Sequence, residues 1–229
     1  MNKTIPSIAS ALAVILLQGL PSVAQAQSTG QWLIHGGVTQ VKPHVTSGAL
    51  TSPAPANTTT DVLADTQATA QVTYMLSDAL ALTVPLGAGF NHDIVGRGAI
   101  DGVGVIGRVH ALPVTLNAQY RFGAADAAVR PYLVAGGSYV YFDDAQGSAT
   151  LNGINPANPP GGQTALSVKS KFAFNAGLGI SVRLAPRWYL DASYTQTFLK
   201  TRTTLSTGQT LDATLNPSAL TLSVAYQFK

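Results

Sequence analysis

Three glycines have the spacing of a motif that binds dinucleotides in other proteins. Gly102, Gly104 and Gly107 form the string G-x-G-x-x-G, in which the backbone approaches a pyrophosphate at the start of a helix. Such a site needs a strand before the glycines and a helix that opens at them. Pro113 and the alternating pattern that follows Arg108 argue against that helix. We therefore interpret the glycines as parts of a loop.

The histidines are the other candidates for chemistry: His35, His44, His92 and His110. None shows the H-E-x-x-H spacing that presents two imidazoles to a zinc ion. The chain has no cysteine, which excludes disulfides, thiolate metal sites and a cysteine nucleophile, and it has no G-x-S-x-G elbow. We expect no metal, no cofactor and no catalytic residue. A Ser-His hydrolase stays open, because spacing along a chain does not show which side chains meet in space.

The first 26 residues have the pattern of a secretory signal peptide. Lys3 precedes an apolar stretch from Ile8 to Leu20, and Ala24-Gln25-Ala26 follows as a small-x-small cleavage site. The apolar stretch is shorter than the ~20 residues of a spanning helix. We predict cleavage after Ala26, which leaves residues 27–229 as one domain.

The rest of the chain is poor in charge and has no second long apolar run. Only 10% of the residues of the whole chain are charged, whereas a soluble domain carries ~25%. The basic residues are scattered and the formal net charge of the whole chain is only +3, which leaves no footprint for nucleic acid. A transmembrane β-barrel suits an exported chain of this kind, because its backbone groups pair between strands and no edge stays open.

Alternation with a period of two residues predicts eight strands, each about as long as a membrane-spanning strand. The last stretch shows it most clearly, because apolar residues at positions 220, 222, 224, 226 and 228 alternate with small or polar ones. The predicted strands cover residues 31–42, 63–76, 79–90, 112–122, 131–142, 167–183, 188–202 and 219–229.

The connections between these strands support the same architecture. Long linkers cover residues 43–62, 91–103, 143–166 and 203–216, and short linkers lie between them. Outer-membrane barrels alternate long extracellular loops with short periplasmic turns in this way. The sequence therefore predicts an all-β protein, an eight-stranded antiparallel transmembrane β-barrel in the cell outer membrane.

The apolar faces of the strands are predicted to meet lipid. The opposite faces are small and mostly uncharged, unlike a solvated surface. Aromatic residues near the strand ends are typical of the girdles at the two membrane interfaces: Trp32, Tyr132, Trp188, Tyr226 and Phe228. The alternative is a secreted soluble sandwich or lipocalin-like barrel, whose apolar face points inward.

Several stretches of the mature chain together carry a resemblance to a known family. They are Asn91-His92-Asp93-Ile94, the run GRVHALPVTLNAQYRF from Gly107 to Phe122, Arg130-Pro131-Tyr132, Trp188 to Ala192, and the closing Tyr-x-Phe. Together they resemble the OmpW family of small outer-membrane proteins, which includes the AlkL-type alkane importers. Lys229 follows the aromatic residue that normally ends such barrels, and the linkers at 43–62 and 143–166 match poorly.

This resemblance implies a function and a set of partners. It marks His92, Asp93 and His110 as positions of a family loop motif. It implies passive uptake of small hydrophobic molecules, with outer-membrane lipid, such solutes and the barrel assembly machinery as partners. The poorly matching loops mean that the solute preference does not carry over.

Three charged residues fall on inward faces by parity: Arg121, Arg183 and Asp191. A buried charge needs a partner. We predict that Asp191 pairs with Arg183 or Arg121 in a polar plug low in the barrel. In the alternative, Arg183 lies exposed at the periplasmic mouth.

A barrel of eight strands is barely wide enough for its own side chains. A plug would also stop an apolar solute from leaving along the axis, so the remaining route is sideways through the wall. Pro85 lies within a predicted strand and cannot donate to the ladder, and Gly87 and Gly89 follow it. We predict a lateral opening there, a route that the resemblance also implies. The alternative is a structural or receptor barrel that binds partners through its loops and transports nothing.

Overall fold

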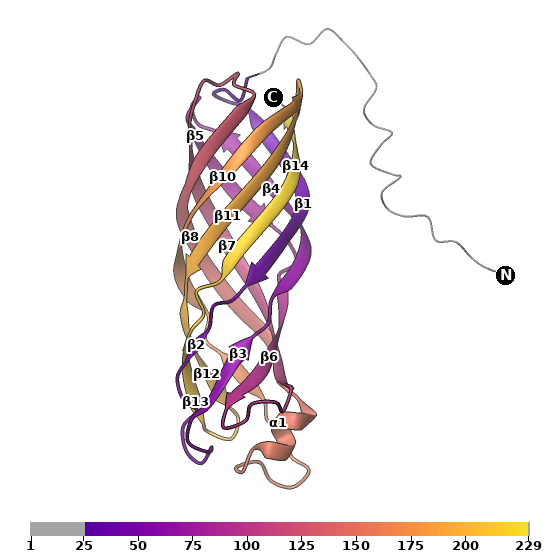
Figure 1. Cartoon of the computed structure of the whole chain (residues 1–229), viewed down its shortest axis with the longest axis vertical. Coiled ribbons are helices and arrows are strands. Elements are labelled where there is room, and N and C mark those ends of the chain that lie inside the picture. The colour runs from indigo at the N-terminus through magenta and orange to yellow at the C-terminus, as the bar shows by residue number, and fades with distance from the viewer. Residues whose placement is uncertain (1–25, 229) are drawn as a thin grey trace, which may run out of the picture.

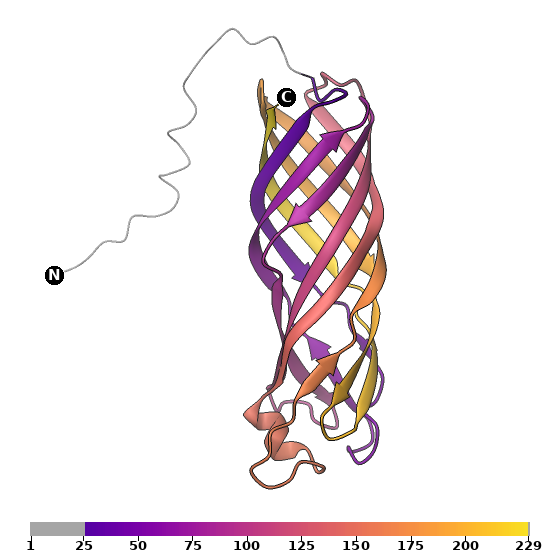
Figure 2. The ribbon, with the colours of Figure 1, turned by 180° about the vertical axis from the view of Figure 1, so that it is seen from behind.

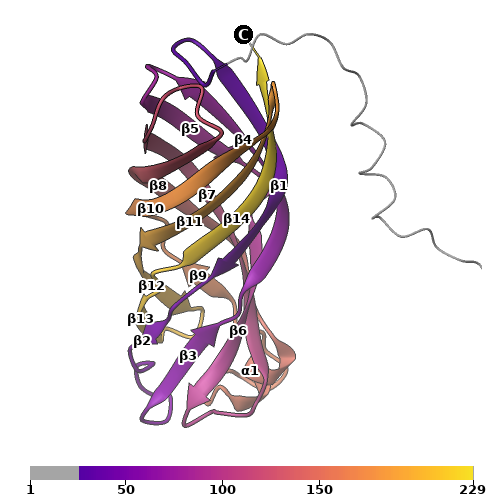
Figure 3. The ribbon, with the colours of Figure 1, turned by 45° about the horizontal axis from the view of Figure 1, so that its top comes forward.

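The computed structural model describes residues 26–228 as strands β1 to β14 and one short helix, α1. The predicted signal peptide, apart from Ala26, lies outside the described residues, and so does Lys229. The strands run obliquely around the wall of an elongated barrel (Figures 1 and 3). Trp32 and Phe228 lie at one end, called here the terminal end, and α1 lies at the opposite end, called the loop end.

Eight strands form the wall. They are β1 (Trp32–Lys42), β4 (Asp65–Met75), β5 (Leu80–Leu86), β7 (Val105–Arg121), β8 (Val129–Gly147), β10 (Lys171–Ala185), β11 (Trp188–Phe198) and β14 (Ser218–Phe228). Each pairs antiparallel with its neighbours in the order β1-β4-β5-β7-β8-β10-β11-β14. The ring closes because β1 and β14 pair from Trp32↔Phe228 to Lys42↔Ser218. The predicted eight-stranded barrel is confirmed, and the alternation up to the chain end is explained by this closure.

The loop end contains more regular structure than the sequence predicted. The extra elements are β2 (Thr46–Ser47), β3 (Thr58–Val62), β6 (Phe90–Gly98), α1 (Ala149–Ile154), β9 (Leu166–Val168), β12 (Lys200–Leu205) and β13 (Thr210–Thr214). The strand β6 continues the line of β5 along β7, and β3 pairs with β6. The predicted linker at 91–103 is therefore partly strand, and His92 and Asp93 lie in β6 rather than in a loop. Short threonine-rich segments pair here without a clear alternation to reveal them.

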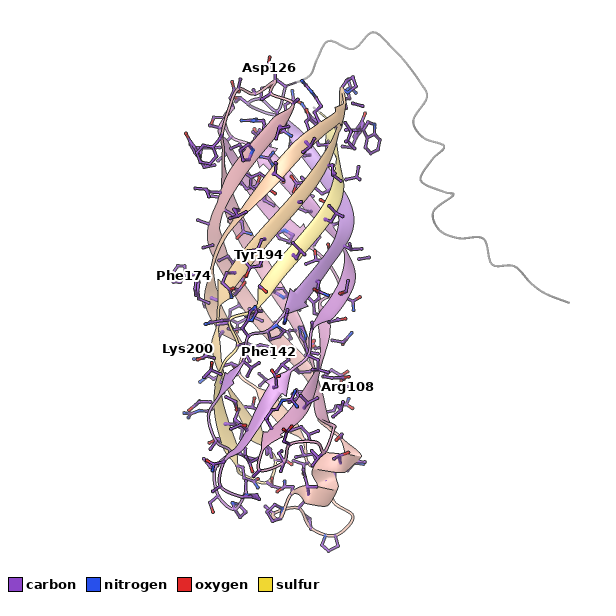
Figure 4. All side chains as sticks on the ribbon, viewed as in Figure 1. Arg108, Asp126, Phe142, Phe174, Tyr194 and Lys200 are labelled. Atoms are coloured by element: carbon purple, nitrogen blue, oxygen red, sulfur yellow. The ribbon has the colours of Figure 1, made fainter. Side chains whose placement is uncertain are left out.

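The apolar faces of the wall strands point outward. Phe172 and Phe174 on β10 are 83% and 79% exposed, and Figure 4 shows Phe174 projecting away from the barrel. Polar side chains such as Thr73, Gln119 and Gln227 are buried on the inner face. This distribution is the reverse of a soluble barrel, whose apolar residues point inward. No helix of the described chain is long and apolar enough to cross a membrane.

Outward aromatic residues gather at the terminal end. Trp32 is paired in register with Phe228 and Tyr74, and Trp188 with Tyr226. The ring centroids of Trp32 and Tyr74 lie 4.6 Å apart, and those of Trp188 and Tyr226 lie 4.9 Å apart. The rings thus form a continuous band over β4, β1, β14 and β11.

Two neighbouring glycines on β1 differ in the space that a side chain would find. A Cβ atom at Gly37 would lie 2.1 Å from the carbonyl oxygen of Leu222, whereas a Cβ at Gly36 would meet nothing within 4 Å. We expect Gly37→Ala to lower the free energy of unfolding by about 1–3 kcal/mol, the usual cost of overpacking. Gly36→Ala is the matched control and should change it little. Urea unfolding in lipid vesicles measures both, and equal effects would contradict this packing.

Candidate functional site

Arg121 is the centre of a polar cluster at the terminal end of the lumen. Its side chain is 1% exposed. The Nε and Nη2 atoms donate to Oε1 of Gln119 at 3.1 and 2.7 Å, and Nη1 donates to Oε1 of Gln27 at 2.8 Å. The guanidinium thus has neutral acceptors on every nitrogen. We call Arg121, Gln119, Gln27, Arg130, Tyr132 and Asp191 the polar plug.

Tyr132 joins Arg121 to Asp191. The guanidinium carbon of Arg121 lies 4.9 Å from the centroid of the Tyr132 ring, and the Tyr132 hydroxyl donates to Oδ1 of Asp191 at 2.7 Å. The ion pairs of the described chain do not include Asp191. The prediction of a direct pair between Asp191 and Arg121 or Arg183 is therefore wrong. Arg183 lies opposite Tyr189 near the β10–β11 turn and is half-buried.

Tyr132 is a second correction, because the sequence predicted it at the membrane interface. It is 2% exposed and lies inside the barrel. Gly179 on β10 makes room for it, because a Cβ there would lie 2.3 Å from Cζ of the ring. The sequence of β8 alternates weakly here, since Tyr132 to Ala135 are four consecutive apolar residues. The inward side of Tyr132 was therefore not visible in the pattern.

Three members of the plug were not predicted as site residues: Arg130, Gln27 and Gln119. Arg130 is 1% exposed and donates to the backbone carbonyls of Gln27 at 3.0 Å and Asp78 at 2.5 Å. Gln27 is fully buried, and its Nε2 donates to Oγ of Ser181 at 3.1 Å. Arg130 stands in the Arg-Pro-Tyr stretch, which was a usable signal. Gln27 precedes the first strand, where no periodicity exists to place it.

A cavity of about 250 Å³ lies between the plug and the loop end. Toward the loop end its wall is apolar, with Phe90, Val109 and Leu199 among the lining residues. Toward the plug the lining becomes polar and includes His35, Asn117 and Asn175. None of the six plug residues borders this cavity. The lumen therefore changes from apolar to polar along the barrel.

The wall beside this cavity contains an interrupted ladder. Strands β5 and β7 pair from Leu80↔Tyr120 to Thr83↔Asn117, and pairing with β7 resumes on β6 at Phe90↔Ala111. Residues 112–116 of β7 have no strand partner on that side. We call the interval between residues 84–89 and 112–116 the β5–β7 gap. Figure 2 shows the magenta arrow of β5 ending part-way along the barrel.

The candidate residues Pro85, Gly87 and Gly89 all lie in this gap and line the cavity. Leu112 and Pro113 line it from the opposite edge. The gap lies at the level of the lipid-facing side chains, because Leu86 and Val114 on its two edges are 49% and 65% exposed. The cavity and the lipid-facing surface thus come close together here.

Backbone direction explains why the ladder stops. The N–H of Arg121 donates to the carbonyl of Ala79, the residue before β5, whereas that of Phe122 donates to the carbonyl of Pro131 on β8. Since neighbouring residues of a strand point their backbone groups to opposite sides, odd-numbered residues of β7 and β5 face each other. Pro85 and Pro113 therefore both lack the N–H that would point into the gap. Pro113 was missed as a gap residue, although a proline inside a predicted strand was the available signal.

His110 holds the loop-end edge of the gap. Its Nε2 lies 2.7 Å from the carbonyl of Ala88, and its Nδ1 lies 2.5 Å from Oδ1 of Asp143. A carbonyl and a carboxylate both accept hydrogen bonds, so this arrangement favours the protonated imidazole, in which both ring nitrogens donate. The hydrogen bond to Asp143 is the main cause that raises the pKa of His110 above its ordinary value. His110 lies beyond the lipid-facing part of β7, which begins at Val114.

The other two motif residues lie beside His110. Asp93 accepts from Nε of Arg108 at 2.6 Å. His92 is buried, and its Nδ1 lies 2.8 Å from the carbonyl of Leu63. Burial lowers the pKa of His92, so it stays neutral where His110 is charged. The motif joins β6 to β7 and to the β3–β4 connection at Leu63, just beyond the gap.

Comparison with known proteins places this geometry in a family. The family model described as OmpW matches residues 28–228. The chain belongs to the OmpW family. It is 30% identical over 222 residues to outer membrane protein W of Salmonella typhi, covering 96% of this chain and 97% of that protein. It is 28% identical over 209 residues to outer membrane protein W of Vibrio cholerae, covering 89% of this chain and 91% of that protein.

Solved structures agree with the fold. OprG from Pseudomonas aeruginosa superposes with a TM-score of 0.78 at 22% identity, over 89% of this chain and 98% of that one. AlkL in lipid bilayers superposes with a TM-score of 0.64 at 22% identity, over 93% of this chain and 97% of that one. As an OmpW-family protein the chain is a non-enzymatic barrel of the outer membrane. Its short turns at the terminal end face the periplasm, and its loop end faces outward.

The link from Tyr132 to Asp191 should contribute to stability. We expect Tyr132→Phe to lower the free energy of unfolding by about 1–3 kcal/mol, because the buried carboxylate loses its donor. Tyr194→Phe is the matched control, since that hydroxyl lies on the exposed outer face. Asp191→Asn should also destabilise the barrel. Urea unfolding in vesicles tests this, and a Tyr132→Phe variant as stable as the control would contradict the link.

The His110 contacts should depend on pH. Because its pKa is raised in the folded protein, the stabilisation is present below the unfolded pKa of ~6.5 and is lost as the pH rises through the folded pKa. We expect Asp143→Asn to lower the pKa of His110, measured by NMR titration of the ring. Asp144→Asn is the control and should lower it less. An unchanged pKa in Asp143→Asn would show that the hydrogen bond has no such effect.

Proposed function

We propose that this barrel lets small hydrophobic molecules enter the outer membrane passively, by lateral release through the β5–β7 gap. The observation that carries the proposal is the pair of prolines at the gap, Pro85 and Pro113, with the cavity reaching both. The resemblance to AlkL-type importers supports the same route. No bond is made or broken, so the chain needs only to provide a path.

The path has three parts. Solutes enter at the loop end, where apolar side chains such as Phe90 and Leu199 border the cavity. They cannot continue along the axis, because the polar plug fills the terminal end with buried charge and amide groups. They leave sideways between Pro85 and Pro113, where Leu86 and Val114 on the outer surface meet the hydrocarbon of the bilayer.

The two prolines provide the sharpest test of this route. Replacing Pro85 or Pro113 with Val restores a backbone N–H that points into the gap, and the double variant should extend the ladder between β5 and β7. We expect octane uptake to slow about tenfold in the double variant, because the opening narrows, while the barrel still folds. Pro186→Ala is the control, since Pro186 lies exposed in the β10–β11 turn.

Uptake is measured in a Gram-negative host that lacks its own OmpW-family protein, with octane and a small sugar as the two solutes. Faster octane entry with unchanged sugar entry supports the proposal. Faster sugar entry would show an axial aqueous pore and contradict the plug. Unchanged entry of both would favour a structural or receptor barrel, and full octane uptake in the double proline variant would reject the gap as the exit.

A further inference from the structure

We propose that the floor of the cavity binds the polar head of a neutral amphiphile, such as a primary alcohol, while its hydrocarbon chain lies in the apolar part of the lumen. This inference rests on the proposed function and narrows its solute class. The geometry points to His35 on β1 as the residue that receives the head group.

His35 is a buried side chain with one free ring nitrogen. It is 1% exposed and borders the cavity. Its Nε2 lies 3.2 Å from Oγ1 of Thr73, whereas its Nδ1 has no hydrogen-bond partner in the described chain. A buried nitrogen of this kind is costly when it is left unpaired. A hydroxyl or carbonyl group on a solute in the cavity would supply the missing partner.

The lining of the cavity favours a neutral head group. No Asp, Lys or Arg is among the residues that line the cavity, so nothing there pairs with a carboxylate or an ammonium. The polar groups nearby are amides and hydroxyls. The Nδ2 atom of Asn175 donates to Oδ1 of Asn117 at 3.1 Å and to Oγ of Ser138 at 2.8 Å. Among the buried side-chain atoms of the described chain that have no hydrogen-bond partner, Nδ1 of His35 is the one that belongs to a residue lining this cavity.

The position of His35 also fits the exit. In the register of the wall, His35 lies opposite Gln71, and Gln71 lies opposite Pro85. The last ladder pair before the gap, Thr83↔Asn117, contains another residue of the cavity floor. A head group held at His35 is therefore next to the terminal-end edge of the β5–β7 gap. The hydrocarbon chain above it lies beside the gap itself.

The binding test uses the barrel in lipid nanodiscs with ¹⁵N-labelled histidine, and 1-octanol and octane as probes. We expect 1-octanol to shift the ring-nitrogen resonances of His35 and octane to leave them unchanged. The His44 resonances serve as an internal control, because Nε2 of His44 is already bonded to Oγ of Ser218 at 2.9 Å and His44 does not line the cavity. Equal shifts of His35 with both probes, or none with either, would overturn the proposal.

The uptake test uses His35→Leu, with His44→Leu as the matched control. We expect His35→Leu to slow 1-octanol entry about threefold to tenfold, the equivalent of one hydrogen bond, and to leave octane entry unchanged. His35→Gln keeps a hydrogen-bonding group and should retain more 1-octanol entry than His35→Leu. If His35→Leu fails to fold, His35→Gln is used in its place.

The two proposals fail in different ways. If the wild-type barrel speeds entry of neither solute, the transport function fails, while the resonance shifts still decide whether His35 binds an alcohol. If both solutes enter faster through the wild type and His35→Leu slows neither or slows both equally, transport stands and the head-group site is wrong.

Discussion

The constraint on which the structure depends is the cost of an unpaired backbone N–H in hydrocarbon. In a bilayer such a group costs several kcal/mol, so a barrel wall has to be closed and fully paired. The β1–β14 pairing provides that closure. Proline lowers the cost of an opening in the wall, because it removes one such donor. Pro85 and Pro113 each remove one, on the two edges of the β5–β7 gap.

The interior follows from the narrowness of the barrel. Eight strands leave room for little more than side chains, so a small set of residues determines what the lumen accepts. At the terminal end, the absence of a side chain at Gly179 leaves room for the ring of Tyr132. Tyr132 in turn contacts both Arg121 and Asp191. Above the plug the lining is neutral throughout, and it becomes apolar toward the loop end. The closed floor and the interrupted wall are the two features that support the proposed lateral exit.

Much of the fold was predictable, because alternation reports directly on a two-sided strand. The run to Phe228 and the outward Phe172 and Phe174 were clear for that reason. Tyr132 was not, since it begins a run of four consecutive apolar residues and the space for its ring depends on Gly179 of another strand. Gln27 was not predictable either, because it precedes the first strand and no alternation places it. A local pattern can place Pro85 in a strand, but only the strand pairing shows that its missing N–H points toward β7, where Pro113 lies on the other edge of the same gap.

The most direct test of lateral release closes the gap with a cross-link. The chain has no cysteine, so Leu86→Cys with Val114→Cys introduces a single pair across the gap. Leu82→Cys with Ala118→Cys places a control pair in the intact ladder. Octane uptake is measured before and after reduction of each cross-linked barrel. Uptake that is lost when the gap is cross-linked, returns on reduction and is unaffected by the control pair is the result expected here. Full uptake through the cross-linked gap would contradict lateral release.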